Sequence, residues 1–276
     1  MSNPGTSFAG RTRADGRHLL VARTPQQILH LINDSGYPLQ LALQEVVESQ
    51  WPAVRALPEL HWHNEARNVE GWLDLLIPHD RKRFLISVKR LLETDWAFLD
   101  TEEGATETTE ARLYSFGLKR DGIGFWQKVR VSPSSRHGLF MAMPGSRDRQ
   151  NRLLEAEARM LLAAVEALSQ TEERLPQPQW PPYPTRLYIP VIATTARLHS
   201  YALARGQVDL ATGKAAPGGL QGTSVSVVRM TKAFLVPGDT SEIKSLAQLA
   251  LEQLRTVFVV EAPHLTEFIR CFDLAY

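Results

Sequence analysis

The sequence predicts an α/β protein in which a mixed central β-sheet is flanked by helices. Hydrophobic residues make up 43% of its 276 residues and charged residues 22%, which is ordinary globular usage and sufficient to bury a core. Several short runs are rich in strand-forming residues, and they are interrupted by one long segment, Arg149–Arg174, with helical periodicity. A helix of that length is expected to cover one face of the sheet.

Charge and cysteine content exclude several classes of protein. The 31 basic and 30 acidic residues give a net charge of +1, which argues against a strongly basic nucleic-acid coat but leaves room for a local basic groove. The single cysteine, Cys271, rules out an intramolecular disulfide and a cysteine-rich metal site. No run approaches the roughly 18 apolar residues of a membrane helix, and the beginning lacks the apolar core of a secretory signal. The sequence therefore predicts a cytoplasmic protein with no membrane partner.

The N-terminal part is expected to contain a leader and two helices. Residues 1–20 lack periodic apolar positions and are expected to be mobile, whereas 21–276 are expected to form a single α/β domain. Thr24 has the position of a helix N-cap and Gln27 closes a capping box. Gly36 ends this helix, and a second runs from about 38 to 50. The buried stripe of the first helix would consist of Ile28, Leu29 and Ile32.

Beyond Pro58 the apolar pattern becomes that of strands. Strands are expected over 59–64, 69–77, 83–89, 112–118, 125–131 and 139–143. After the long helix, a Pro-rich crossover at 176–184 leads to strands over 187–194 and 225–236 of the same sheet, separated by a Gly-rich surface loop or hairpin over 206–222. The chain is expected to finish with a helix over 241–254, a strand over 257–260 and a helix over 264–272.

The most informative stretch is the hairpin formed by 69–77 and 83–89. Asp74 falls near the middle of its first strand and Lys89 near the end of the second, both among apolar residues. Burying a carboxylate is costly unless a cation, hydrogen bonds or an ion pair compensates, so this placement indicates a site. A cross-strand ion pair between Asp74 and Lys89 with a purely structural role is the alternative.

This pattern resembles the PD-(D/E)xK nuclease superfamily, in which a helix is followed by a hairpin that carries an Asp and by a strand that carries an acidic-x-Lys motif. The resemblance covers roughly residues 38–99. It implies a restriction-endonuclease-like core with a C-terminal elaboration, and magnesium-dependent hydrolysis of DNA phosphodiesters in phage defence or DNA processing. By this resemblance Asp74 binds the metal, Lys89 positions the attacking water, and Glu45 or Glu48 supplies an additional carboxylate from the first helix of the core.

The chain departs from the family pattern at Ser87, which stands where the acidic residue of the motif is expected. A hydroxyl is a neutral and weaker magnesium ligand, so the metal site loses one charge. In some restriction enzymes of this fold a later segment supplies the carboxylate, about fourteen residues after the lysine; Glu103 lies at that spacing, beside Glu102. Alternatively the site has decayed, and the fold acts as a catalytically inactive module that binds nucleic acid or protein.

Basic residues near the hairpin are candidate contacts for phosphates. They are Arg83, Arg90, Lys119, Arg120 and Lys128. DNA is accordingly the expected partner, and a homo-oligomer or a protein partner is also compatible with the sequence.

The remaining aromatic side chains favour simpler interpretations. His61 and His63 share one side of a strand, but a zinc site needs a third ligand, so they are expected to be exposed or to pack without metal. Tryptophans at strand periods are expected to fill the core rather than to stack on bases. They are Trp51, Trp62, Trp72, Trp96 and Trp126.

Overall fold

The protein has a mixed α/β fold, as the sequence predicts. The computed structural model describes residues 24–91, 94–101, 107–116, 124–142, 149–175, 186–204, 206–216, 218–234 and 245–275. The predictions of a leader over 1–20 and a crossover at 176–184 lie outside these residues, as do those for Glu103, Lys119 and Arg120.

Five α-helices occur in the described residues, and the first begins as predicted. They are α1 (Pro25–Asp34), α2 (Tyr37–Gln50), α3 (Arg149–Arg174), α4 (Leu246–Glu252) and α5 (Leu265–Cys271), with a short 3-10 helix η1 (Ala262–His264) before the last. The Gln27 amide donates to the Thr24 side chain at 3.3 Å and the Thr24 amide donates to Gln27 Oε1 at 2.8 Å, which forms the capping box. Between α1 and α2, Gly36 takes a φ of 82°, which favours glycine.

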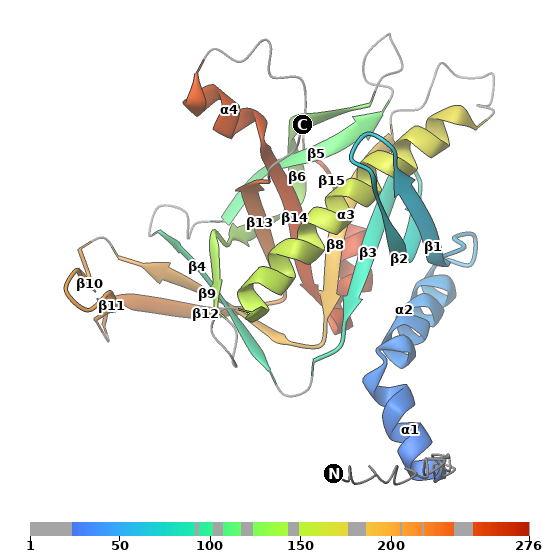
Figure 1. Ribbon diagram of the computed structural model, residues 1–276, viewed down its shortest axis with the longest axis horizontal. Coiled ribbons are helices and arrows are strands. Elements are labelled where there is room, and N and C mark those ends of the chain that lie inside the picture. The colour runs from blue at the N-terminus through green and yellow to red at the C-terminus, as the bar shows by residue number, and fades with distance from the viewer. Residues whose placement is uncertain are drawn as a thin grey trace, which may run out of the picture.

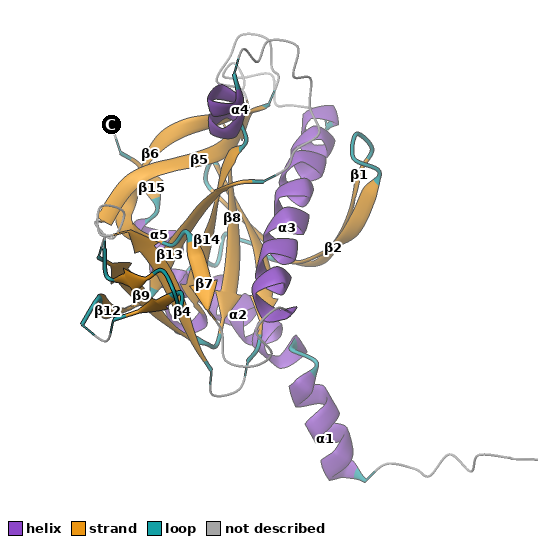
Figure 2. Cartoon of the chain, turned by 60° about the vertical axis from the view of Figure 1, so that its left-hand side comes forward, coloured by secondary structure: helices purple, strands orange, loops and turns teal. Residues whose placement is uncertain are grey.

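Helix α1 extends away from the sheets (Figures 1 and 2). Its apolar residues Ile28, Leu29 and Ile32 are between 46% and 57% exposed, so the prediction that they form a buried stripe is wrong. A capping box and an amphipathic period are local features that predict a helix, but they do not determine what the apolar face packs against.

The larger sheet has the strand order β1-β2-β3-β8-β14-β13-β6-β15, and β5 pairs with both β6 and β8. Strands β1, β2 and β3 are antiparallel neighbours, whereas β3, β8 and β14 run parallel. Because β5 also pairs with β8, the strands β5, β6, β13, β14 and β8 form a closed circuit of hydrogen-bonded pairs. The strands are β1 (Leu57–Asn64), β2 (Val69–His79), β3 (Lys82–Lys89), β5 (Glu107–Phe116), β6 (Phe125–His137), β8 (Arg186–Thr194), β13 (Val227–Ala233), β14 (Leu254–Glu261) and β15 (Asp273–Leu274).

A second sheet has the order β12-β9-β4-β7 and continues from the first. The parallel pair β3 and β8 leads into the parallel pair β4 and β9. Thr195 Oγ1 links the two connecting segments, because it accepts from the Leu91 amide at 2.8 Å and donates to the Leu91 carbonyl at 2.7 Å. The predicted hairpin within 206–222 is β10–β11, whereas β4 was not predicted. The strands are β4 (Asp95–Thr101), β7 (Phe140–Ala142), β9 (Arg197–Leu203), β10 (Val208–Asp209), β11 (Lys214–Ala215) and β12 (Leu220–Val225).

Helices cover both faces of the larger sheet. Helix α3 crosses one face (Figure 1), where Leu161 and Val165 pack in one buried cluster with Trp62 and Tyr188. Helices α2 and α5 cover the other face, with their apolar residues in a second cluster. The prediction that the long helix covers a sheet face is confirmed. None of the helices in the described residues is long and apolar enough to cross a membrane.

Candidate functional site

The candidate site lies where β2 and β3 part. Their pairing ends at Leu75 and Ile86, while β2 continues beside β1 and β3 continues beside β8. Asp74 Oδ2 accepts a hydrogen bond of 2.6 Å from the Val88 amide. The side-chain amide of Gln40 on α2 donates to the Asp74 carbonyl at 2.6 Å. Backbone groups that leave a ladder need other partners, and here these partners fix Asp74 at the point of divergence.

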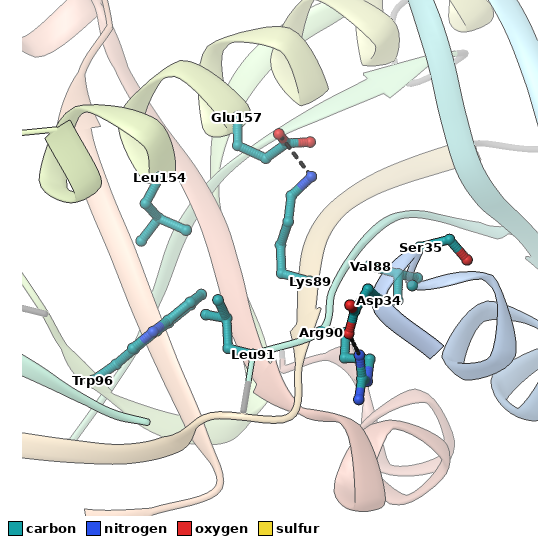
Figure 3. Close-up of a pocket in the computed structure, with 10 residues that line it drawn as sticks. Asp34, Ser35, Val88, Lys89, Arg90, Leu91, Trp96, Leu154 and Glu157 are labelled. Atoms are coloured by element: carbon teal, nitrogen blue, oxygen red, sulfur yellow. Dashed lines mark hydrogen bonds and ion pairs between the residues drawn. The ribbon is translucent and has the colours of Figure 1, made fainter. Parts of the chain in front are cut away.

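Glu157, on α3, reaches the same opening. The Ser87 hydroxyl donates to Glu157 Oε1 at 2.6 Å and lies 3.3 Å from Asp74 Oδ2. Lys89 Nζ forms an ion pair with Glu157 Oε2 at 2.9 Å (Figure 3). Ser87 and Lys89 are two residues apart on β3 and therefore share a face. The structure thus brings together Asp74, Ser87 and Lys89, and it adds a second carboxylate from α3.

The two carboxylates leave the site with an excess of negative charge. Burial raises the pKa of Asp74 above its usual value, and the negative charge of Glu157 adds to this, whereas the Val88 amide, Lys89 and Ser87 lower it. The single hydroxyl hydrogen of Ser87 can be donated to only one carboxylate at a time. A divalent cation would relieve this imbalance, and carboxylate and hydroxyl oxygens are the hard ligands that magnesium prefers.

Two hollows meet at the Lys89–Glu157 ion pair, because both residues line each of them. The carboxylate cavity, of about 270 Å³, is also lined by Asp74, Ser87 and Trp72. The Arg90 hollow, of about 410 Å³, is lined by Arg90, by the α1–α2 junction and by the apolar side chains that Figure 3 shows around Lys89. These apolar residues are Val88, Leu91, Trp96 and Leu154.

Helix α2 does not bring the predicted carboxylates to the cavity. Glu45 is exposed, and Glu48 Oε1 accepts hydrogen bonds from the Ala56 amide at 3.1 Å and from the Gln44 side chain at 3.3 Å. Neither residue lines the carboxylate cavity. This corrects the expectation that Glu45 or Glu48 completes the ligand set, because the face of α2 that turns inward carries Gln40 instead.

The predicted phosphate contacts are largely engaged in ion pairs. Arg83 is 15% exposed and donates to Glu172 Oε1 from Nε at 3.1 Å and from Nη2 at 2.8 Å, so its guanidinium already has a partner within the protein. Lys128 pairs with Glu110 at 2.7 Å. Arg90 Nη1 donates to the Asn33 carbonyl and lies 3.4 Å from Asp34 Oδ1, so it lines its hollow as a bound cation.

Two residues of the site were missed in the sequence. Glu157 occupies the apolar stripe of α3 together with Leu154 and Leu161, and an acidic residue at such a position was the available signal. Trp72 is 65% exposed, which contradicts the prediction that it fills the core, although Trp62 at 4% and Trp96 at 1% confirm it for themselves. Because Leu73 is buried, its neighbour Trp72 must face the other side of β2.

Comparisons with known proteins do not assign a role to this site. A scan against protein-family models found no match, and searches of curated proteins and of solved structures found no significant match. Among the described residues, no three His, Cys, Asp or Glu side chains gather as a metal-binding group. A metal at this site would therefore be held by the pair Asp74 and Glu157 with other oxygens, and magnesium commonly uses one or two carboxylates with substrate phosphates.

Proposed function

We propose that this protein is a magnesium-dependent nuclease that hydrolyses DNA phosphodiesters at the carboxylate cavity. The observation that carries the proposal is the convergence of Asp74, Glu157 and Lys89 on one cavity at the point where two strands part. The order of elements supports it as well. The resemblance to the PD-(D/E)xK superfamily implies a helix, a hairpin that carries an Asp and a strand that carries a Lys. In this chain α2 is followed by β1, by β2 with Asp74 and by β3 with Lys89.

We assign to Glu157 the role of the acidic residue that Ser87 replaces in the motif. In this proposal Asp74 and Glu157 hold the ion, and the carboxylate missing from β3 comes from α3 instead. Ser87 acts as a positioning residue, because its hydroxyl fixes Glu157 at 2.6 Å. Magnesium, when bound, supplies the positive charge that stabilises the phosphate and lowers the pKa of a bound water.

Lys89 would change its partner when the substrate binds. Its ammonium group pairs with Glu157 Oε2 at 2.9 Å, and it has three hydrogens to donate. A phosphate oxygen at the cavity offers it a further acceptor. Lys89 then stabilises negative charge on the phosphate and donates a hydrogen bond that orients the attacking water.

An inactive module is the second candidate, and one observation favours it. Lys89 and Glu157 satisfy each other at 2.9 Å, as they would in a site that keeps its ion pair for structural reasons alone. In this alternative the fold binds nucleic acid or protein without cleaving it.

Cleavage assays with matched variants separate the two candidates. Asp74→Asn and Glu157→Gln each remove one charge with little change of shape and should slow magnesium-dependent cleavage of DNA by at least ~100-fold, the scale of losing one charge-stabilising group. Glu155→Gln is the control, because Glu155 lies on the same helix and pairs with Lys232 at 2.6 Å outside the cavity. Cleavage by Asp74→Asn at the wild-type rate rejects the assignment. DNA binding without any cleavage by the wild type supports the inactive module.

A further inference from the structure

Helix α1 presents an apolar face to solvent. All ten of its residues are exposed, and the helix extends away from both sheets (Figure 2). Ile28, Leu31 and Ile32 are three and four residues apart, so they lie on one face of the helix, and Leu29 adjoins that face. These four side chains are between 45% and 57% exposed. Within the described residues, the face is therefore open.

A helix of this length needs a surface to pack against. It has ten residues, and isolated helices shorter than about 12–15 residues are marginal in water, because most helical stability comes from packing of the amphipathic face. Both ends of α1 are capped, by the Thr24–Gln27 box at its start and by Arg90 Nη1, which donates to the Asn33 carbonyl at its end. Caps satisfy the backbone but leave the apolar face in water, so we expect another surface to cover it.

Arg90 also fixes the direction in which α1 points. Its Nη1 lies 3.4 Å from Asp34 Oδ1, which ties the last turn of α1 to the end of β3. Residues 34–36 also line the Arg90 hollow, beside the Lys89–Glu157 pair. A contact that covers α1 would thus hold one wall of that hollow in place.

The charge of α1 favours a neutral partner. Residues 25–34 contain no Lys or Arg, and their two titratable side chains, His30 and Asp34, pair with each other at 3.2 Å. Helices that lie on membranes are rich in Lys and Arg on their polar face, and surfaces that bind nucleic acid use these residues for phosphates. An apolar face without charge does not repel an identical face, so a second copy of the chain fits it.

The exposed apolar area is close to what a stable dimer needs. Tyr37 and Leu41, one turn apart at the start of α2, are 57% and 63% exposed and extend the apolar surface beyond the junction. At roughly 100 Å² for each half-exposed side chain, these two residues and the four of α1 offer about 600 Å² in each copy. A standard interface buries about 800 Å² of each partner, and polar residues at the rim normally supply part of it.

We infer that two copies of this chain form a symmetric dimer in which their α1 helices pack antiparallel through the face that carries Ile28 and Ile32. A twofold axis puts the same surface on both sides of the contact, and dimers of this symmetry are the commonest oligomers. Leu29 lies near the middle of α1 and hence near that axis. The inference goes beyond the proposed function, because this surface lies outside the carboxylate cavity.

Sedimentation velocity of the full chain tests the dimer. At high concentration the wild type should sediment with twice the 31.0 kDa mass of one chain. Leu29→Glu places a charge at the centre of the contact and should raise the Kd of the dimer by about 30-fold or more, the scale of a central interface residue. Gln26→Glu adds the same charge on the polar side of α1, and Leu210→Glu replaces a leucine that is 96% exposed between β10 and β11; both should leave the Kd unchanged.

A cross-link identifies the faces that meet, without relying on α1 to stay folded in Leu29→Glu. Cys271 is the single cysteine of the chain, so Leu29→Cys combined with Cys271→Ser leaves one thiol near the middle of α1. A short bismaleimide should join two copies of this variant. Leu210→Cys in the same background is the control and should stay monomeric on a denaturing gel.

Three results would overturn the inference. The first is a wild type that sediments as a monomer at every concentration up to about 0.1 mM. The second is a dimer whose Kd is the same in Leu29→Glu as in the wild type, since another surface then forms it. The third is a monomer that sediments with vesicles of phosphatidylcholine and phosphatidylglycerol and loses this binding in Leu29→Glu, which would make α1 a membrane-binding helix.

Discussion

Two glutamates on α3 provide a direct comparison between a site carboxylate and an ordinary ion pair. Glu155 pairs with Lys232 at 2.6 Å and Glu157 pairs with Lys89 at 2.9 Å, and all four side chains are partly exposed. Replacing either glutamate by Gln removes one Glu–Lys ion pair of a kind that contributes about 0–1 kcal/mol. The two variants differ because only Glu157 accepts a hydrogen bond from Ser87 and faces Asp74.

The structure indicates the size of that difference. Glu157→Gln weakens the hydrogen bond from Ser87, which costs about 1 kcal/mol. It also removes a negative charge whose oxygen is no more than about 6 Å from Asp74, a repulsion of about 3 kcal/mol at an effective dielectric constant of 20 and about 1 kcal/mol after screening of groups this exposed. These effects offset each other. Without magnesium, Glu157→Gln should therefore cost no more free energy of unfolding than Glu155→Gln.

Magnesium should then separate the two variants in thermal melts. At a magnesium concentration of about 100 times its Kd, a folded protein with the site gains about 2.7 kcal/mol, which corresponds to a Tm increase of about 6 °C for a chain of this size. The wild type and Glu155→Gln should show this increase, and Glu157→Gln should not. An equal response to magnesium in both variants, with a larger loss of stability in Glu157→Gln, would refute the assignment and make Glu157 a structural ion-pair partner.

Three further substitutions test the groups around the site. Because the pKa of Asp74 is raised, the folded state binds its proton more tightly than the unfolded state does. The stability of the wild type relative to Asp74→Asn should therefore fall as pH rises from the ordinary carboxyl pKa through the raised one. A difference in free energy of unfolding between the two proteins that stays constant over that pH range in urea unfolding would contradict this. Gln40→Leu leaves the Asp74 carbonyl without its donor and should lower stability by about 1–2 kcal/mol in urea unfolding and slow cleavage as well; unchanged cleavage would show that α2 does not position Asp74. Arg83→Met leaves Glu172 without its two-point partner and should cost about 2 kcal/mol in urea unfolding while DNA affinity stays constant; the opposite result would restore Arg83 as a phosphate contact.

Local patterns predicted most of the elements because the physics that forms them is local. The capping box at Thr24 fixes where α1 begins, and the 3.6-residue period of α3 gave both of its ends as the structure has them. Burial depends on distant partners, so the exposure of the apolar residues of α1 could not be predicted from their spacing. Strand β4 was missed although Trp96 and Phe98 alternate with less buried residues, and its partners β7 and β9 come later in the chain.

The same distinction applies to the candidate site. Asp74, Ser87 and Lys89 lie on strands joined by a tight turn, so their juxtaposition follows from the register of one hairpin. Glu157 arrives from a helix, and its place above Ser87 depends on how α3 lies across the sheet. Spacing along the chain pointed to Glu103 instead, which lies outside the described residues. The spacing of residues along the chain does not show which residue of a helix will lie over a given strand, because that depends on how the helix packs on the sheet.

Carrying the second carboxylate on a helix changes what Ser87 does. A carboxylate on β3 itself would be held beside Lys89 by the strand alone, whereas Glu157 depends on the packing of Leu154 and Leu161, which share its face of α3. Two donors on β3 fix the orientation of its carboxylate: the Ser87 hydroxyl at 2.6 Å and the Lys89 ammonium at 2.9 Å. On the proposed function, Ser87 is therefore not a lost ligand but the group that orients the replacement, and an acidic residue at this position would crowd a third negative charge against Asp74 and Glu157.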